Sequence, residues 1–189
     1  MPLWKRLGFL FVFVVPALMP AAAWLGVRSG HHDLMAWFPL FFLFVLLPLA
    51  DYALGHDPIN PSAQEARALE SDDWFKWMTL AALPAQLGVM TWSGWHLVHA
   101  DFGIAGTIGW LLSQGIVGGV LAINVAHELI HKDTALERAA GGLLLTSVGY
   151  HGFKIEHIRG HHVHVSTPED ASSSRFGQSL WHFLPRALL

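Results

Sequence analysis

Residues 102–131 read FGIAGTIGWLLSQGIVGGVLAINVAHELIH, an apolar run that ends in two histidines four positions apart. A helix needs about 20 consecutive apolar residues to cross the hydrocarbon core of a bilayer, and residues 102–126 satisfy that length. Neutral imidazole is a common ligand for iron, zinc and copper. This stretch therefore predicts a membrane-spanning helix that delivers metal-binding side chains to the membrane surface.

The rest of the chain is also apolar enough for a membrane protein. Of its 189 residues 53% are hydrophobic, and its mean hydropathy is positive, which is unusual for a soluble domain. Three further stretches, residues 8–27, 34–54 and 77–98, are long enough to span a bilayer. The sequence thus predicts an all-α, polytopic transmembrane helix bundle with about four spanning helices. Five prolines inside these stretches predict kinks rather than loops, because neighbouring helices satisfy the freed carbonyl groups: Pro16, Pro20, Pro39, Pro48 and Pro84.

A shorter apolar stretch, residues 139–153, lies between two histidine clusters. With about 15 residues it is too short for a comfortable span, so it predicts a re-entrant or interfacial helix. Such a hairpin would return the second cluster to the same membrane face as the first. Because the sequence contains no internal repeat, linker or low-complexity tract, residues 1–189 are predicted to form a single membrane-embedded unit.

Basic residues predict the orientation of the bundle. Short loops rich in Lys and Arg stay on the cytoplasmic side. With the N-terminus inside, all of the 11 Lys and Arg residues except Arg28 face the cytoplasm, and so do the histidine clusters. No basic stripe indicates binding to nucleic acid. The absence of cysteine excludes disulfides, thiolate ligands and iron–sulfur clusters bound by this chain.

The two histidine clusters have spacings that suit a metal. Residues four apart lie on one face of a helix, so His127 with His131, and His157 with His161, are predicted to form ligand pairs. His162 follows His161 directly and is expected to point elsewhere, toward a second ion. Most of the isolated histidines lack such spacing and are interpreted as interfacial or hydrogen-bonded residues: His31, His32, His56, His96, His99 and His182.

The two clusters belong to longer motifs. Residues 124–132 read NVAHELIHK, and residues 156–165 read EHIRGHHVHV, followed by STPEDASSSR at 166–175. Together these motifs resemble the integral-membrane alkane monooxygenases, which belong to the same histidine-box superfamily as the fatty acid desaturases. The likeness extends more loosely to Asp51 and to the loop at 57–61, and so covers most of the chain.

The resemblance implies a non-haem centre of two iron ions that activates O2, inserts one oxygen atom into an unactivated C–H bond and reduces the other to water. The substrate would be a medium-chain alkane that enters from the lipid phase and leaves as a primary alcohol. Electrons would come from reduced rubredoxin, supplied by rubredoxin reductase. The implied location is a bacterial inner membrane.

Five histidines match the ligand positions of the family: His127 and His131 in the first motif, and His157, His161 and His162 in the second. Helical spacing alone would favour His164, seven residues after His157, over His162. The family pattern favours His162, and we follow it. Glu128 and Glu156 adjoin ligands and are predicted to accept hydrogen bonds from imidazole N–H groups. No catalytic residue beyond the metal ligands is predicted.

The chain departs from the family after the second motif. Alkane monooxygenases carry a third motif of the form His-x-x-His-His and another histidine downstream, and neither occurs before Leu189. The chain is therefore expected to be the N-terminal part of a longer hydroxylase, and this part alone is expected to be incomplete as an enzyme.

Other functions remain open. A xylene-type hydroxylase, or a fatty acid desaturase or hydroxylase, would use the same ligands on a different substrate. An inactive, truncated metal-binding membrane fragment is consistent with the missing third motif. A zinc protease is suggested only by His127-Glu128-x-x-His131, in which the glutamate would act as general base, and the second motif argues against it.

Overall fold

The structure is a computed structural model that describes residues 3–55, 61–70 and 72–188. Among these residues it contains helices and no strand, so the predicted all-α fold is confirmed. The chain divides into two compact units, Met1–Val148 and Gly149–Leu189, each with helices and contacts of its own. The expectation of a single membrane-embedded unit stays a prediction.

The first predicted span is built from three helical segments: α1 (Leu3–Gly8), the 3-10 helix η1 (Phe9–Phe13) and α2 (Val14–Ser29). Pro16 lacks the N–H that would bond the carbonyl of Val12, which lies in η1. The tighter turn therefore falls where proline removes an α-helical hydrogen bond. The chain stays helical through this proline, in agreement with the expectation that it does not form a loop.

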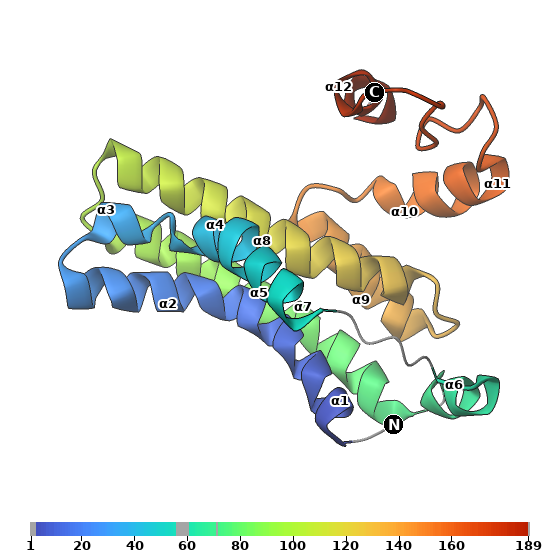
Figure 1. The fold of residues 1–189 in the computed structure, drawn as a ribbon, viewed down its shortest axis with the longest axis horizontal. Coiled ribbons are helices and arrows are strands. Elements are labelled where there is room, and N and C mark those ends of the chain that lie inside the picture. The colour runs from blue at the N-terminus through green and yellow to red at the C-terminus, as the bar shows by residue number, and fades with distance from the viewer. Residues whose placement is uncertain (1–2, 56–60, 71, 189) are drawn as a thin grey trace. The chain divides into compact units, whose positions relative to one another are not determined.

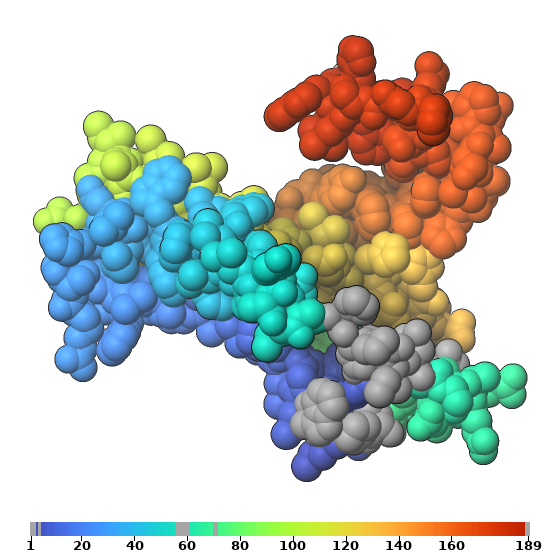
Figure 2. All heavy atoms as spheres, viewed as in Figure 1, coloured from blue at the N-terminus to red at the C-terminus, as the bar shows by residue number. Residues whose placement is uncertain are grey.

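The second predicted span consists of α3 (His32–Met35), α4 (Phe38–Phe41), the π-helix η2 (Phe42–Leu46) and α5 (Leu47–Leu54). Pro48 removes the bond to the carbonyl of Phe44, which lies inside η2. This span is drawn in light blue and cyan on the face seen in Figure 2, and it exposes many apolar side chains, among them Phe41, Phe44, Leu46, Leu49 and Leu54. An apolar surface of this size suits lipid better than water.

Three helical stretches are long and apolar enough to cross a membrane: Lys5–Ser29, His32–Leu54 and Ile104–Ile130. They correspond to three of the four predicted spans, and they make the chain a membrane protein. The fourth prediction, 77–98, falls within α7 (Asp73–His99), which has 27 residues but is not among the three. The short helix α6 (Ala63–Glu70) precedes α7. Residues 56–60, which carry part of the family resemblance and the isolated His56, lie outside the described residues.

The helices of the first unit pack around α8 (Ile104–Ile130), which contacts α2, α3, α4 and α7 (Figure 1). Several side chains of this core are fully buried, including Met19, Trp110, Val117 and Leu121. A Cβ on Gly109 would lie 2.5 Å from Nε1 of Trp37, so glycine lets this ring lie against α8. The Trp37 indole then donates a hydrogen bond to the carbonyl of Ala105 at 3.2 Å. This packing fixes the axis of α8, and with it the helix end that carries the first histidines.

The helix predicted over 139–153 is α9 (Ala135–Ser147), which packs along α8 and begins earlier than expected. Thr134 caps it: its hydroxyl accepts the N–H of Glu137 at 3.2 Å and donates to the Glu137 carboxylate at 2.5 Å. Thr134 and Glu137 have the spacing of a capping box, and the N-cap half of that arrangement, the bond from the Glu137 N–H to the Thr134 hydroxyl, is present. Apolar content alone misplaced the start of the helix, because its first turn contains the charged residues Glu137 and Arg138. A re-entrant or interfacial position for α9 stays a prediction.

The second unit has one irregular helical segment and one terminal helix. The elements are α10 (Phe153–Ile155), the π-helix η3 (Glu156–His161), α11 (His162–His164) and α12 (Leu180–Leu188). Turns connect α11 to α12. Arg186 of α12 donates hydrogen bonds to the carbonyls of Asp170, at 3.4 Å, and of Ser173. These bonds tie the terminal helix to the turns that follow the second histidine cluster.

Candidate metal centre

The first histidine pair, His127 and His131, lies at the C-terminal end of α8, where the helix has one buried and one exposed face. Ala126, Leu129 and Ile130 are buried, because this face packs against α9. The two histidines lie on the exposed face. Since residues four apart share a side of an α-helix, burying one face of α8 presents both imidazoles outward.

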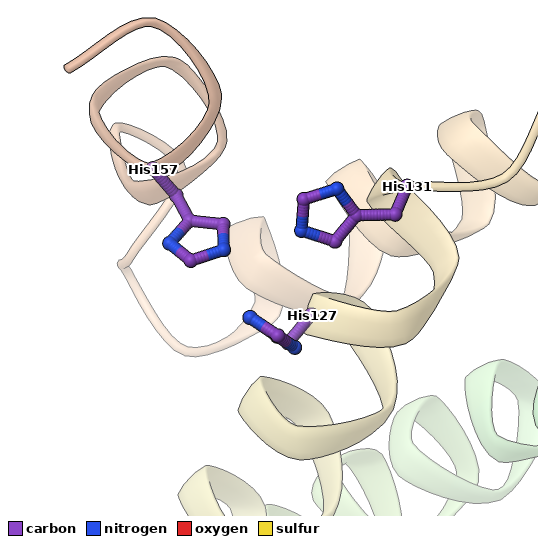
Figure 3. Close-up of side chains that lie close together, drawn as sticks. All are labelled: His127, His131 and His157. Atoms are coloured by element: carbon purple, nitrogen blue, oxygen red, sulfur yellow. The ribbon is translucent and has the colours of Figure 1, made fainter. Parts of the chain in front are cut away.

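The two imidazoles lie close enough to serve one ion. Their ring centroids are 5.2 Å apart with planes at 72°, and a ligand nitrogen of His127 lies within 4.8 Å of one of His131. Figure 3 shows both side chains projecting from the same side of α8, and it also draws His157, which belongs to the second unit. Two nitrogens bound to one metal at about 2.1 Å stand roughly 3 Å apart. To bind one ion, the two nitrogens, which lie within 4.8 Å of each other, would have to stand at that shorter separation.

Gly141 of α9 lets the two helices approach closely beside this pair. A Cβ at Gly141 would lie 3.0 Å from Cβ of Leu129 and from Cγ2 of Ile130, and 3.2 Å from the carbonyl oxygen of Ala126. These separations are tighter than most Cβ contacts, so a side chain at this position would require its neighbours to shift by a few tenths of an ångström. The close approach holds the end of α8 in place.

Charged side chains hold the turn that follows the pair. Arg138 donates hydrogen bonds to the carbonyls of Lys132, at 3.1 Å, and of Asp133. Glu128 forms an ion pair with Lys132 one helical turn away, with 2.5 Å between Oε1 and Nζ. The prediction that Glu128 accepts a hydrogen bond from an imidazole stays a prediction.

The second histidine group, His157, His161 and His162, lies on and just after the π-helix η3. On an α-helix, residues five apart point about 140° away from each other around the axis. A π-helix bonds residue i to i+5 and brings such residues onto one side. Nε2 of His157 and Nε2 of His162 are accordingly 3.0 Å apart. This is the separation of two imidazoles on one ion, about 3 Å, and in the absence of metal it suits an N–H···N hydrogen bond.

The expectation that His162 points away from His157 is therefore wrong, because it assumed a regular α-helix. The same assumption favoured His164. That residue ends α11, and its carbonyl accepts hydrogen bonds from the N–H of Thr167 at 2.9 Å and from its hydroxyl at 2.6 Å. Of the two alternatives, the π-helix places His162 beside His157.

The third member of the group, His161, is held by a buried carboxylate. Its ring lies parallel to that of His157, with centroids 5.5 Å apart, and its Nδ1 is 2.8 Å from Oδ2 of Asp170. Asp170 also accepts hydrogen bonds from the hydroxyl of Ser173 and, at 2.9 Å, from the N–H of Ser172. The Ser173 hydroxyl contributes most to lowering the pKa of Asp170 below its ordinary value, although burial acts to raise it. The carboxylate is therefore ionised at neutral pH.

Asp170 is a residue that the spacing of the motifs did not single out. It stands nine residues after His161, and only the resemblance of 166–175 to the family pointed to this region. The predicted carboxylate of this motif, Glu156, is exposed and lies over Gly160, where Oε2 would be 3.3 Å from an added Cβ. A hydrogen bond from an imidazole to Glu156 stays a prediction.

The donor set of both histidine groups fits a non-haem metal ion. Imidazole nitrogens with carboxylates nearby suit iron as well as zinc, and a chain without cysteine offers no thiolate. Each group brings at least two imidazoles together within its own unit.

Known proteins resemble this chain over almost its whole length. Residues 103–189 match the fatty acid desaturase family. Alkane 1-monooxygenase 2 of Alcanivorax borkumensis is 47% identical over 98% of this chain and 49% of its own length. Alkane 1-monooxygenase 2 of Pseudomonas aeruginosa is 46% identical over 97% of this chain and 49% of its own length. The chain is therefore similar to alkane 1-monooxygenases over almost its whole length.

The resemblance predicted from the two motifs is thereby confirmed. The chain spans about half the length of the curated alkane 1-monooxygenases that it matches. The region shared with the fatty acid desaturases includes both the first histidine pair and the second histidine group.

Proposed function

We propose that this chain carries metal ligands of a membrane non-haem di-iron monooxygenase, which hydroxylates the terminal carbon of medium-chain alkanes to primary alcohols. O2 is the co-substrate, and rubredoxin with rubredoxin reductase supplies the electrons. The observation that carries the proposal is the 3.0 Å approach of Nε2 of His157 to Nε2 of His162, in a chain that is 46–47% identical to two alkane 1-monooxygenases. The two nitrogen atoms already lie at about the separation expected for two imidazole ligands of one ion.

Five histidines take part in the proposed centre: His127, His131, His157, His161 and His162. The 3.0 Å separation between Nε2 of His157 and Nε2 of His162 supports their binding to the same ion. His161 has its Nδ1 occupied by Asp170, which leaves Nε2 as its ligand atom. The first histidine pair contributes two further nitrogens at the end of α8.

Iron, when bound, supplies the redox chemistry with O2 that alkane oxidation needs and that zinc lacks. The residues of this chain would bind the metal and orient its ligand side chains. The imidazoles would hold the metal, and α8, which is long and apolar enough to cross a membrane, carries the first histidine pair at its end.

The proposed location is the bacterial inner membrane, with the N-terminus and both histidine groups on the cytoplasmic side. The support is the distribution of Lys and Arg, because only Arg28 falls in a predicted outer loop. The chain has no cysteine, so a single introduced thiol is a unique label. In intact cells, a membrane-impermeant thiol reagent should label Ser29→Cys and spare Ser174→Cys, and the reverse result would refute the orientation.

The experiment that tests the proposed function measures iron and product together. The chain spans about half the length of its curated relatives, so the test uses the protein made from the complete gene. That protein, purified in detergent, is analysed for iron by mass spectrometry and then supplied with octane, 18O2, rubredoxin, rubredoxin reductase and NADH. We expect bound iron and 18O-labelled 1-octanol. The double variant His157→Ala/His162→Ala should lose most of the iron and the alcohol, whereas His182→Ala, outside both motifs, should keep them.

A second candidate is a fatty acid desaturase, because residues 103–189 match that family. The ligands would be the same, but the product would be an alkene group in an acyl chain rather than an alcohol. Unsaturated product without labelled alcohol would favour the desaturase. Iron bound without any product would favour a metal-binding membrane protein that is not an enzyme.

A further inference from the structure

Asp170 is the buried acid of the second unit. Only 3% of the residue is exposed, whereas the adjacent Glu169 is exposed. Burying a carboxylate is costly unless hydrogen bonds compensate for the lost water, so its partners show what the fold uses it for.

Each oxygen of the Asp170 carboxylate has a protein donor. Oδ1 accepts from the N–H of Ser172 at 2.9 Å. Oδ2 accepts from the Ser173 hydroxyl and lies 2.8 Å from Nδ1 of His161. Arg186 of α12 bonds the carbonyls of Asp170 and Ser173, so the terminal helix also holds the turn that presents this carboxylate.

The chemistry of this contact fixes the proton on the ring of His161. Both oxygens of Asp170 accept hydrogen bonds from Ser172 and Ser173, and Nδ1 of His161 approaches Oδ2 at 2.8 Å as a donor would. A neutral ring that donates through Nδ1 carries its lone pair on Nε2. Imidazole ligands of metals commonly donate the opposite N–H to a carboxylate, which fixes the tautomer and the ring orientation.

We propose that Asp170 is a positioning residue that holds His161 in the Nδ1–H tautomer with Nε2 presented as the metal-binding nitrogen, and that the turn 166–175 together with α12 forms the frame that aims this carboxylate. The inference rests on the proposed function in one respect, the role of His161 as a ligand. It adds a residue that neither motif spacing nor the predicted Glu128 and Glu156 supplied. The frame exists within the second unit alone, so the ring is oriented before any ion arrives.

Two measurements on the full chain in detergent test the inference. The first needs no metal: 15N chemical shifts of the His161 ring report which nitrogen carries the hydrogen. Wild type should show the Nδ1–H tautomer, and Asp170→Ala should shift the ring toward a mixture of tautomers. The second is a titration with Co(II), followed by its visible absorption, in which Asp170→Ala should bind about 10- to 100-fold more weakly.

Two further variants separate positioning from general damage. Asp170→Asn keeps the size of the side chain and one acceptor oxygen, so it should retain part of the tautomer preference and lose less affinity than Asp170→Ala. Glu169→Gln removes the neighbouring exposed carboxylate and should match wild type in both measurements. Amide exchange across 166–175 shows whether each variant keeps the turn folded.

The outcomes distinguish failure of this inference from failure of the proposed function. If wild type binds no Co(II), the proposed function fails and the inference falls with it. If wild type binds Co(II) and Asp170→Ala binds it equally well with an unchanged His161 tautomer, the positioning role is overturned while the proposed function stands. The inference is supported if Asp170→Ala loses both the tautomer preference of His161 and the affinity for Co(II), and if Asp170→Asn keeps part of each.

Discussion

Packing positions the first histidine pair, whereas hydrogen bonds position the second histidine group. His127 and His131 stand on the exposed face of a regular helix whose opposite face is buried against α9. His157 and His161 stand on a π-helix, beside turns held by a buried carboxylate.

The difference teaches how each site would respond to change. Dense packing tolerates little added volume, because neighbouring atoms cannot move far. A hydrogen-bonded frame tolerates changes of volume better but depends on each donor and acceptor, since a buried polar group left without a partner is costly. Volume changes should therefore damage the first histidine pair, and the loss of single polar groups should damage the second histidine group.

The largest expected effect comes from Gly141→Ala, which disrupts the packing of α9 against α8 beside the first histidine pair. The new Cβ would meet Leu129 and Ile130 at 3.0 Å, and overpacking of this kind costs about 1–3 kcal/mol. We expect a matching fall in the free energy of unfolding of the chain in detergent, measured by chemical denaturation.

Gly142→Ala is the matched control. A Cβ at Gly142 meets nothing within 4 Å, and alanine in a helix interior is more stable than glycine by about 0.5–1 kcal/mol. The control should therefore unfold at a higher denaturant concentration than wild type. Equal destabilisation by the two substitutions would show that close packing at Gly141 does not hold the helices together.

The next effect in size is expected from Ser173→Ala, which disrupts the hydrogen bonds that hold the turn 166–175 beside the second histidine group. It removes the hydroxyl that donates to Asp170 and that accepts the N–H of Ser166 at 2.9 Å. Amides of 166–175 should exchange with solvent about tenfold faster, because local opening becomes easier. Ser174→Ala, an exposed neighbour, should exchange like wild type; similar acceleration in both variants would rule out a specific frame.

A smaller effect is expected from Thr134→Ala, which removes the cap of α9. The Glu137 N–H and carboxylate lose their partner, at a cost of about 1 kcal/mol. Chemical denaturation measures the loss, and Thr146→Ala should change stability by less than about 0.5 kcal/mol, because that hydroxyl bonds only a carbonyl of its own exposed helix face. A stability unchanged by Thr134→Ala would mean that packing on α8, not capping, sets the start of α9.

The smallest effect is expected from Glu128→Gln. Its ion pair with Lys132 is largely exposed, and pairs of this kind contribute about 0.2–0.5 kcal/mol on a helix surface. The difference from wild type should shrink as salt is added, because exposed charges are screened. A difference that persists in high salt would mean that Glu128 has a buried or metal-linked role.

Sequence reasoning succeeded where a long, repetitive signal existed. The spans 8–27, 34–54 and 102–126 are apolar over about 20 residues, as a bilayer requires, and each corresponds to a helical stretch that is long and apolar enough to cross a membrane. The pairing of His127 with His131 followed from α-helical spacing, and α8 is a regular helix up to that point. A capping box at Thr134 and Glu137 also stood in the sequence and would have located α9.

The positions of His162 and Asp170 depended on backbone geometry that short-range sequence patterns do not encode. The π-helix η3 inserts one residue into the helical repeat, so α-helical spacing misjudged His162. Asp170 meets His161 through a turn, and its distance along the chain follows no period. The family resemblance located both regions, but the contacts themselves depend on how the backbone folds.

The irregular turn of η3 has a consequence for how metal motifs are searched and redesigned. A helical wheel drawn at α-helical pitch sets His157 and His162 on different faces, so a filter based on such wheels would discard a pair whose nitrogens are 3.0 Å apart. Grafting this motif onto a straight designed helix would likewise separate the two rings, unless one intervening residue were deleted to restore a four-residue step.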